Sequence, residues 1–244
     1  MHEYVMVPIK FNPDLLADFE SRFTAALNNE QCHVIVLTGD LNWFSMGMDL
    51  DYISTDYEPL FISQFCNILK MVKNSPKPVL ARVEGDVIAG GIALMCVADY
   101  IISCETVSFS LPESSFGITP TIAMSCLLER ITPHHLKFLV WSATAISARK
   151  ALEWGIVDKI STTETIEQDV RAMSNKLSHI PESIIRESKL LLDWHSSFDK
   201  TLDLGSHLLG EKLSDPQIIE KTRHYLECIS LFNDEYADHQ YEQN

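Results

Sequence analysis

The first thirty residues contain a β-branched apolar stretch followed by a segment with helical spacing of its hydrophobic positions. Residues 3–11 (EYVMVPIKF) are rich in β-branched side chains and predict a strand. Asn12 and Pro13 resemble an N-cap followed by proline at the first helical position. Beyond them, apolar residues recur every three or four positions and predict a helix with one buried face, formed by Leu15, Leu16, Phe19, Phe23 and Leu27.

Three short, mainly apolar stretches further along the chain predict strands. They cover residues 32–40 (CHVIVLTGD), 77–85 (KPVLARVEG) and 100–106 (YIISCET). Such runs are typical of strands that are covered on both faces in a parallel sheet. Helical periodicity separates them, first in residues 61–72 and then in a buried helix that starts at Gly90 and Gly91. Strands and helices that alternate in this way predict an α/β fold with a mostly parallel sheet.

The second half of the chain is mainly helical in pattern. Helical spacing occupies much of residues 121–154 and ends at Gly155, a residue type favoured directly after a helix. Residues 156–161 (IVDKIS) predict a last short strand, and the remainder is interrupted at Pro181 and Pro216. We therefore expect a core over residues 1–163 and an α-helical region over residues 164–244.

Composition narrows the class of protein. The 244 residues carry a formal net charge of −15, which argues against a nucleic-acid or anionic-membrane surface because both need positive patches. The six cysteines form no CxxC pair and are expected to be free, buried thiols. The longest apolar run, residues 87–102, contains Gly90, Gly91 and Asp99 and is too short to span a membrane. With no secretory signal recognisable, we expect a cytoplasmic protein.

Two glycine-containing loops follow the first two predicted buried strands, in NWFSMGMDL (42–50) and GDVIAGG (85–91). In open parallel sheets ligands bind outside the carboxyl ends of the strands, so both loops are expected at one edge. Amide N–H groups at helix starts lack partners, and two that converge on one point would form an oxyanion hole. The alternative is that these are ordinary turn glycines. Neither loop contains a GxGxxG or GxxxxGK phosphate motif.

Glu113 lies directly after a proline, between an apolar extended segment and a helical region. One interpretation is a solvated residue at a helix entry. The other is a general acid or base whose pKa is raised by an apolar pocket formed by Leu111, Phe116 and their neighbours. His134 and His135 are best explained as a surface pair, and no ligand spacing predicts a metal. Asp99 is expected to cap or pair at the end of the buried helix.

Four stretches in order resemble the crotonase family, the enoyl-CoA hydratases and isomerases. They are VIVLTGDLNWFSMGMDL, KPVLARVEGDVIAGGIALMCVADYII, VSFSLPESSFGITP and SARKALEWGIVDKI, and the similarity runs from about residue 12 to 160 and more loosely through the tail. The resemblance implies a crotonase-like ββα spiral core with a C-terminal α-helical region. In this family that region takes part in trimerisation, so a homotrimer or a dimer of trimers is expected.

The resemblance also assigns roles to residues. The two backbone donors of the oxyanion hole fall on Met48 and Gly90, and the acid/base on Glu113 of the PE motif. Gly90 would be free of a side chain so that a thioester oxygen reaches its amide, and Gly91 would let the helix start directly behind it. The second glutamate of the hydratases is replaced by Ala93. Substrate-binding positions are expected at Ser45, Met46, Asp49, Tyr52, Gly91, Phe116 and Gly117.

Ala93 and a late SDPQ stretch make the chain most similar to the dehydratases of polyketide β-branching cassettes. Those convert a 3-hydroxy-3-methylglutaryl group on an acyl carrier protein into the 3-methylglutaconyl thioester. A Δ3,Δ2-enoyl-CoA isomerase that uses Glu113 alone is the competing enzyme. A decarboxylase ranks lower because Asp56 stands where those relatives carry a lysine. A catalytically silent scaffold with the same fold is the remaining alternative.

The expected partners follow from the same resemblance. The substrate would be an acyl-CoA or an acyl group on a carrier protein, with no further cofactor, no metal, no nucleic acid and no membrane. Lysines and arginines could form a local docking patch for an acidic carrier protein, or simply a solvated face; they are Lys70, Lys73, Lys77 and Arg82. The family's opening β-hairpin is missing or reduced to YVMVPIK.

Overall fold

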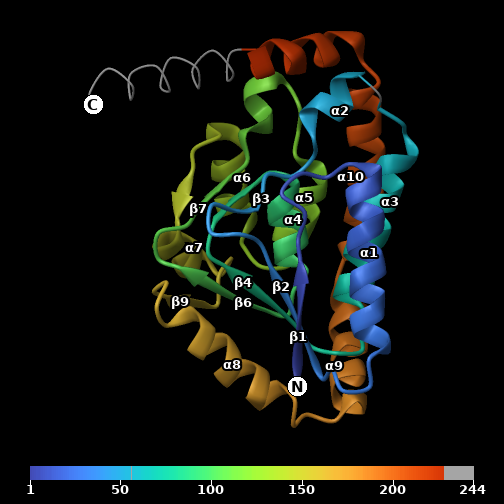
Figure 1. The fold of residues 1–244 in the computed structure, drawn as a ribbon. Helices are drawn as coiled ribbons and strands as arrows, with labels where there is room; N and C mark the ends of the chain where they lie inside the picture. The colour runs from blue at the N-terminus through green and yellow to red at the C-terminus, as the bar shows by residue number, and fades with distance from the viewer. Residues whose placement is uncertain (56, 228–244) are drawn as a thin grey trace, which may run out of the picture.

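Two sheets of mainly parallel strands organise the protein, whose computed structural model describes residues 1–55 and 57–227 (Figure 1). The larger sheet has the order β1-β2-β4-β6-β9 and is parallel throughout. Its strands are β1 (His2–Met6), β2 (Val34–Thr38), β4 (Val79–Val83), β6 (Tyr100–Cys104) and β9 (Lys159–Ser161). The smaller sheet has the order β3-β5-β7-β8, and only the β7–β8 pair is antiparallel. Its strands are β3 (Trp43–Ser45), β5 (Asp86–Ile88), β7 (Ser108–Ser110) and β8 (Ile146–Ser147).

The chain alternates between the two sheets in a repeated order. In each repeat one strand enters the larger sheet, the next enters the smaller sheet, and a helix follows. The pairs are β2–β3, β4–β5 and β6–β7. The helices that follow them are α2 (Leu50–Thr55) and α3 (Leu60–Lys73), then α4 (Gly90–Cys96), and then the 3₁₀ turn η1 (Pro112–Phe116) with α5 (Thr121–Leu127). This order confirms the ββα spiral that was expected from the sequence.

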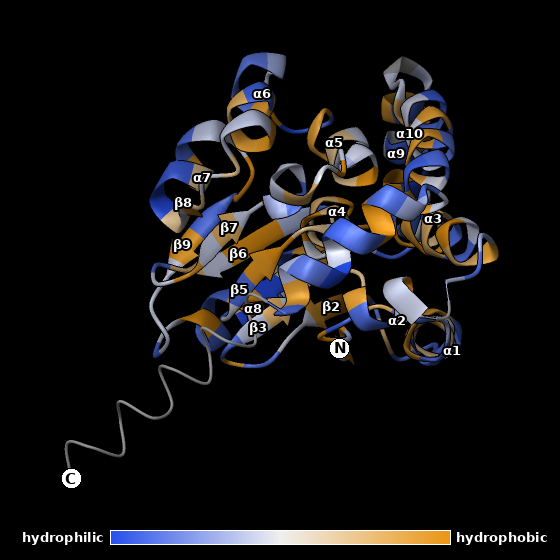
Figure 2. Ribbon diagram, turned by 90° about the horizontal axis from the view of Figure 1, so that it is seen from above, coloured by the Kyte–Doolittle hydropathy of each residue, from blue (hydrophilic) through white to orange (hydrophobic). Residues whose placement is uncertain are grey.

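The mainly apolar stretches form the strands that were predicted for them. Every residue of β2 is buried, and β2 and β6 are among the most hydrophobic ribbons at the centre of the molecule (Figure 2). The short strands β3 and β5 were not predicted, since residues 42–50 and 85–91 were interpreted as loops. Strands of three residues that contain Trp43 or Asp86 are too short to show a period. The glycine loops therefore follow the second sheet, not the first.

The predicted helix at the N-terminus is α1 (Pro13–Asn28). The Asn12 side chain accepts a hydrogen bond from the Leu15 N–H at 3.0 Å, which confirms the N-cap. Leu16, Phe19 and Phe23 are buried as predicted, whereas Leu15 lies on the exposed side. The face of α3 that was predicted to be apolar is buried against the same core.

The N-terminal segment does not form a hairpin. β1 pairs in parallel with β2, and residues 9–11 then run alongside residues 46–49. The Met46 N–H donates to the Ile9 carbonyl at 2.6 Å, and the Phe11 N–H donates to the Gly47 carbonyl at 2.7 Å. The first segment of the chain therefore supports the loop that follows β3.

The helices of the second half lie where helical patterns were predicted. They are α6 (Pro133–Ser142), α7 (Ala148–Trp154), α8 (Ile166–Leu177), α9 (Glu182–His195) and α10 (Phe198–Leu213), and residues 216–227 are helical as well. Gly155 ends α7 with a φ of 87°, as its residue type predicted. α8 packs on β4 and β6, and α10 packs on α5 and α3. Asp56, Cys228 and the rest of the predicted tail lie outside the described residues.

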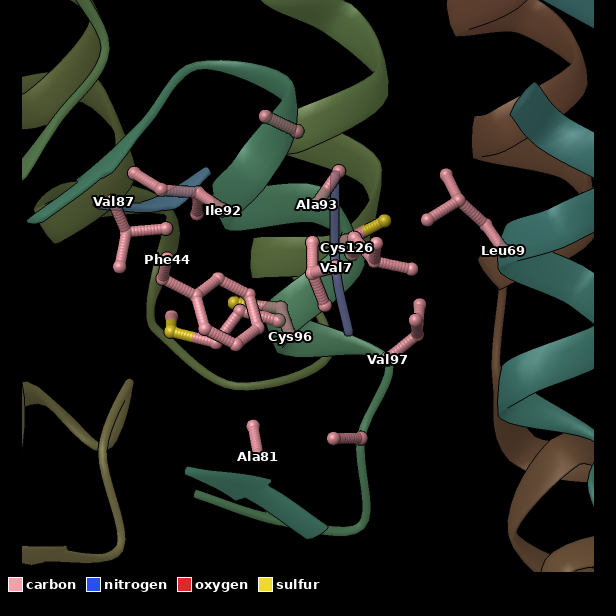
Figure 3. Close-up of a cluster of buried hydrophobic side chains, with 14 of the residues drawn as sticks. Val7, Phe44, Leu69, Ala81, Val87, Ile92, Ala93, Cys96, Val97 and Cys126 are labelled. Carbon is pink, nitrogen blue, oxygen red and sulfur yellow. The ribbon is translucent and has the colours of Figure 1, made fainter. Parts of the chain in front are cut away.

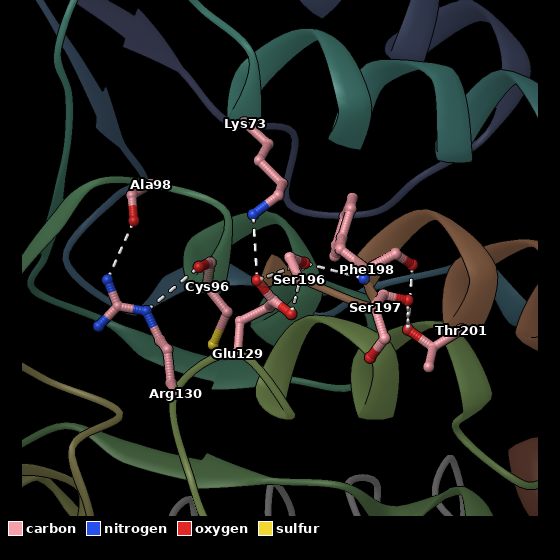
Figure 4. Close-up of polar contacts among 9 residues, drawn as sticks. All are labelled: Lys73, Cys96, Ala98, Glu129, Arg130, Ser196, Ser197, Phe198 and Thr201. Carbon is pink, nitrogen blue, oxygen red and sulfur yellow. Dashed lines mark hydrogen bonds and ion pairs between the residues drawn. The ribbon is translucent and has the colours of Figure 1, made fainter. Parts of the chain in front are cut away.

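The core surrounds α4, whose side chains Ile92, Ala93 and Cys96 are all buried (Figure 3). At the far end of α4, the Arg130 guanidinium donates to the carbonyl oxygens of Cys96 at 3.2 Å and Ala98 at 3.0 Å (Figure 4). Asp99 accepts from the Val79 N–H at 2.7 Å, so it pairs at the helix end as expected. No helix in the described part of the chain is long and apolar enough to cross a membrane.

Candidate active site

Three loops at one edge of the smaller sheet carry the predicted catalytic residues. Met48 follows β3, Gly90 follows β5, and Glu113 follows β7. Because β3, β5 and β7 are parallel neighbours, their carboxyl ends meet at the same edge. All three residues line one cavity of about 300 Å³, together with the predicted Met46 and Phe116. Positions far apart in the sequence are thus brought to a common space.

The backbone around Met48 leaves its amide group free. The Phe11 N–H donates to the Gly47 carbonyl, and the Asp49 N–H donates to the Phe11 carbonyl at 2.9 Å. These bonds use the groups on both sides of the Met48 N–H and not that N–H itself. Within residues 1–55 and 57–227, neither the Met48 N–H nor the Gly90 N–H donates to an acceptor of the protein. Both amide groups lie on residues that line the cavity, where they can serve a ligand oxygen.

Gly90 and Gly91 are under different steric constraints. A Cβ on Gly91 would lie 2.5 Å from the Ser45 carbonyl oxygen, so Gly91 is required by the packing of α4 on β3. A Cβ on Gly90 would make only ordinary contacts at 3.5 Å with Gly47 and Phe11. The packing of the protein therefore does not explain Gly90, and the prediction that a ligand oxygen reaches its amide stays a prediction.

Gly47 brings the two amide groups close together. Its φ is 80°, and a Cβ there would lie 2.6 Å from the Gly90 nitrogen. Ala89, which precedes Gly90, has a φ of 53° and a ψ of −124°. Residues other than glycine rarely adopt this backbone conformation. Backbone strain of this kind clusters at functional sites. Here it turns the chain sharply from β5 into α4, with Gly90 at the corner.

Glu113 is held by a short 3₁₀ turn. The Glu113 carbonyl accepts from the Ile118 N–H at 3.0 Å, and Gly117 closes the turn with a φ of 87°. The residue is half-buried overall, but its Oε2 atom is fully buried and has no hydrogen-bond partner among the described residues. Burial raises the pKa of the Glu113 carboxyl to about 8, and its own backbone N–H offsets this slightly. The helix-entry alternative, a solvated carboxylate, is therefore not the observed environment.

Apolar side chains form most of the cavity wall. They include Leu50, Ile53 and Phe65 on one side and Ile122, Leu209 and Leu213 on the other. Besides Glu113, the described titratable side chains that line it are Lys10 and Tyr225. Lys10 is paired with Asp49 at 3.3 Å and Asp51 at 3.2 Å. An apolar cavity with few polar groups suits an acyl chain whose reacting atoms lie near one buried acid.

Five predicted substrate-binding residues do not line this cavity. The Ser45 hydroxyl donates to the Ile9 carbonyl and accepts from the Gly47 N–H, so it shapes the loop. Asp49 pairs with Lys10, and the Tyr52 ring packs edge-on against Phe61 with its hydroxyl accepting from the Glu58 N–H. Gly91 and Gly117 fit tight backbone positions. These residues support the site, and direct contact with substrate stays a prediction for them.

Four residues of the site were missed from the sequence: Lys10, Gly47, Ala89 and Tyr225. Gly47 is part of the SMGMD stretch, so a glycine between two methionines was the available signal. Ala89 carries no signal, because its φ is set by the surrounding fold. Lys10 and Tyr225 reach the cavity through tertiary packing from the two ends of the described chain.

His134 and His135 do not line this cavity, and His135 instead takes part in aromatic packing. The His135 ring stacks on Trp154 with centroids 4.4 Å apart, next to its neighbour His134. Among the residues that the structure describes, no group of His, Cys, Asp and Glu side chains is arranged to hold a metal ion. The five described cysteines are free and buried.

The chain matches a family model and a number of curated proteins. A family model described as enoyl-CoA hydratase/isomerase matches residues 10–227. The mouse mitochondrial enoyl-CoA hydratase domain-containing protein 3 is 26% identical over 183 residues, which cover 72% of this chain and 60% of the relative. Carnitinyl-CoA dehydratase from Salmonella typhi is 29% identical over 150 residues, which cover 59% of this chain and 56% of the relative. The chain thus spans less than two thirds of the length of these curated relatives.

Solved structures show the same fold. A putative polyketide biosynthesis enoyl-CoA hydratase from Bacillus subtilis superposes with a TM-score of 0.83, 21% identity and coverage of 92% of both chains. A putative enoyl-CoA hydratase from Mycobacterium avium paratuberculosis superposes with a TM-score of 0.79 and 19% identity, covering 92% of this chain and 90% of the other. At these identities the likeness concerns the fold.

Proposed function

Because the chain belongs to the enoyl-CoA hydratase/isomerase family, we propose that its cavity binds an acyl thioester and stabilises the enolate of that thioester. The observation that carries this proposal is the common cavity of Met48, Gly90 and Glu113. Two free backbone donors and one buried carboxyl are the groups that proton abstraction beside a carbonyl requires. An inert scaffold has no need for an unpaired carboxyl oxygen in an apolar wall.

The chemistry follows from these three groups. The thioester carbonyl oxygen accepts from the N–H groups of Met48 and Gly90, which draw charge toward that oxygen. The ionised Glu113 then removes a proton from the adjacent carbon, and the enolate charge rests on the oxygen between the two donors. Because the cavity is apolar, these hydrogen bonds act in a low dielectric and are stronger than in water.

The specific reaction we propose is the elimination of water from a 3-hydroxyacyl thioester. Its substrate would be a 3-hydroxy-3-methylglutaryl group on an acyl carrier protein, and its product the 3-methylglutaconyl thioester of polyketide β-branching. Two comparisons support this choice: the structural neighbour named for polyketide biosynthesis and the relatives named as dehydratases. The largely apolar cavity of about 300 Å³ has room for a short branched acyl group.

The second candidate is a Δ3,Δ2-enoyl-CoA isomerase. Ala93 favours it, because this fully buried residue stands where a hydratase carries its second glutamate. In that reaction Glu113 alone moves a proton from C2 to C4, and no water is lost. Either reaction uses a substrate on CoA or on a carrier protein's phosphopantetheine arm and needs no additional cofactor.

Intact-mass spectrometry separates the two reactions. A carrier protein loaded with the 3-hydroxy-3-methylglutaryl group is incubated with wild-type protein, with Glu113→Gln, and with Glu153→Gln as a control at an exposed ion pair. We expect wild type and the control to remove one water from the thioester, and Glu113→Gln to slow this by at least about 10²-fold. No loss of water with the wild type, together with conversion of a 3-enoyl-CoA, would favour the isomerase instead.

A further inference from the structure

Tyr225 reaches the cavity from the last described helix, residues 216–227. Its ring packs on Phe116 with centroids 4.7 Å apart. Phe116 belongs to η1, the same short turn that carries Glu113. The contact between the two rings therefore places Tyr225 beside the turn that holds Glu113.

The hydroxyl of Tyr225 is available to a ligand. In the described part of the chain it makes no hydrogen bond, whereas Lys10, the other polar group at the cavity besides Glu113, is engaged by two carboxylates. Burial and the nearby charge of Glu113 both raise the pKa of Tyr225 above its ordinary value. The phenol therefore keeps its proton at neutral pH and is able to donate it.

The elimination needs a second proton transfer that Glu113 does not easily supply. Hydroxide is a poor leaving group, so the departing oxygen has to gain a proton as its bond to carbon breaks. Ala93 provides no second carboxyl. A protonated phenol at the same cavity meets this need by its place and its chemistry.

Building on the dehydration proposed above, we propose that Tyr225 is the general acid that protonates the leaving β-hydroxyl group. Glu113 takes the proton from the α-carbon, and the enolate electrons form the carbon–carbon double bond as the bond from the β-carbon to oxygen breaks. The hydroxyl leaves as water with the phenolic proton. The Glu113 carboxyl then returns its proton to the phenolate, directly or through that water, and the enzyme is restored.

Tyr225→Phe tests this assignment because it keeps the ring on Phe116 and removes only the hydroxyl. The matched control is Tyr57→Phe, whose hydroxyl is buried without a hydrogen-bond partner among the described residues and borders a different pocket. In D₂O, loss of water and deuterium incorporation at the α-carbon are measured on the same 3-hydroxy-3-methylglutaryl thioester. We expect Tyr225→Phe to slow water loss by about 10²-fold while deuterium still enters at close to the wild-type rate.

The outcomes separate the two proposals. Water loss at the wild-type rate in Tyr225→Phe, or equal loss of deuterium incorporation and elimination, overturns the assignment of Tyr225 and leaves the dehydration standing. A wild-type protein that incorporates deuterium and never loses water overturns the dehydration, and the role of Tyr225 falls with it. Slower elimination in Tyr57→Phe as well would show a general effect of losing a tyrosine hydroxyl and would also count against the assignment.

Discussion

At the scale of single residues, the site depends on groups that the fold leaves without partners. The N–H groups of Met48 and Gly90 have no acceptor among the described residues, and the Glu113 Oε2 has no donor. Leaving a buried polar group unpaired costs about 1–3 kcal/mol, so such groups are uncommon unless they serve a ligand. The buried, unpaired Oε2 of Glu113 and the two free N–H groups of the half-buried residues Met48 and Gly90 lie at one cavity, where they fit a single bound carbonyl and the carbon beside it.

The raised pKa of Glu113 predicts the pH dependence of the reaction. The carboxyl has to be ionised to act as a base, and burial holds its pKa at about 8. We expect kcat/KM for deuterium incorporation to rise with pH and to reach half its maximum near pH 8. A profile that is flat between pH 6 and 9 would contradict this environment for Glu113.

The same raised pKa predicts that the stability of the folded protein falls as pH rises, whereas its activity increases. A carboxyl whose pKa is higher in the folded protein destabilises the fold as pH rises from its ordinary value of 4.5 toward 8. Glu113→Gln lacks this penalty. We expect the variant to gain about 1–3 kcal/mol over wild type at pH 8.5 and little at pH 4.5, as measured by urea unfolding. An equal difference at both pH values would contradict the prediction.

Gly47→Ala tests the closeness of the two amide groups. Its Cβ would press on the Gly90 nitrogen in a backbone conformation that favours glycine. We expect a fall in activity of about 10²-fold, since losing one oxyanion donor has an effect of that size. The control is Gly155→Ala, which has a similar φ of 87° far from the cavity. It should lower stability by about 1 kcal/mol and leave activity unchanged; equal activity losses in both variants would show a folding effect only.

At the scale of elements, α4 is fixed at both ends. Its first residues pack against β3 through Gly91, and its last turn is held by Arg130, which also donates to the Ile156 carbonyl at 3.1 Å and pairs with Asp158 at 3.2 Å. A positively charged hydrogen-bond donor at a helix C-terminus satisfies the carbonyl oxygens that have no partner within the helix. Arg130 therefore keeps α4, and with it Gly90, in position.

Arg130→Leu is expected to destabilise the protein by about 2–4 kcal/mol, because several carbonyl oxygens and Asp158 lose a partly buried partner. Arg171→Leu is the matched control. Among the described residues Arg171 pairs only with Glu167, on the surface of α8, where an ion pair contributes less than about 1 kcal/mol. Both values come from denaturant unfolding, and similar losses in the two variants would rule out the proposed role of Arg130.

The elements also show what the sequence can predict. The mainly apolar stretches of β2, β4 and β6 were recognisable by their composition, and the capped helix α1 was recognisable by the helical period of its apolar positions. The short strands β3 and β5 were not, although they decide where Met48 and Gly90 lie. The motifs predicted the candidate catalytic residues, but they did not predict the second sheet that brings the loops of these residues together. Tyr225 was out of reach, since only tertiary packing joins its helix to η1.

At the scale of the whole molecule, α9 has a face that the single chain does not cover. None of its described side chains is buried, and the exposed fractions of Leu190, Leu192 and Trp194 are 70%, 71% and 86%. The helix lies at the periphery of the molecule (Figure 2). Exposed apolar surface of this kind marks an interface, and we propose that it takes part in the homotrimer expected from the family resemblance.

Light scattering after size exclusion tests the assembly. We expect a mass of about three times the 27.6 kDa of the chain, or six times for a dimer of trimers. Leu190→Glu with Leu192→Glu should shift the protein toward monomers, whereas Leu41→Glu, at an equally exposed leucine outside α9, should not. A monomeric wild type would contradict the proposed assembly.

The central claim is that Met48, Gly90 and Glu113 together form and hold an enolate. The most direct measurement uses 3-methylglutaryl-CoA, which has an α-proton but no hydroxyl to lose, in D₂O with NMR detection at the α-carbon. We expect the wild type to incorporate deuterium at one of the two α-positions next to the thioester, and Glu113→Gln to be at least about 10²-fold slower. Incorporation at the same rate in both proteins, or none with the wild type, would contradict the account.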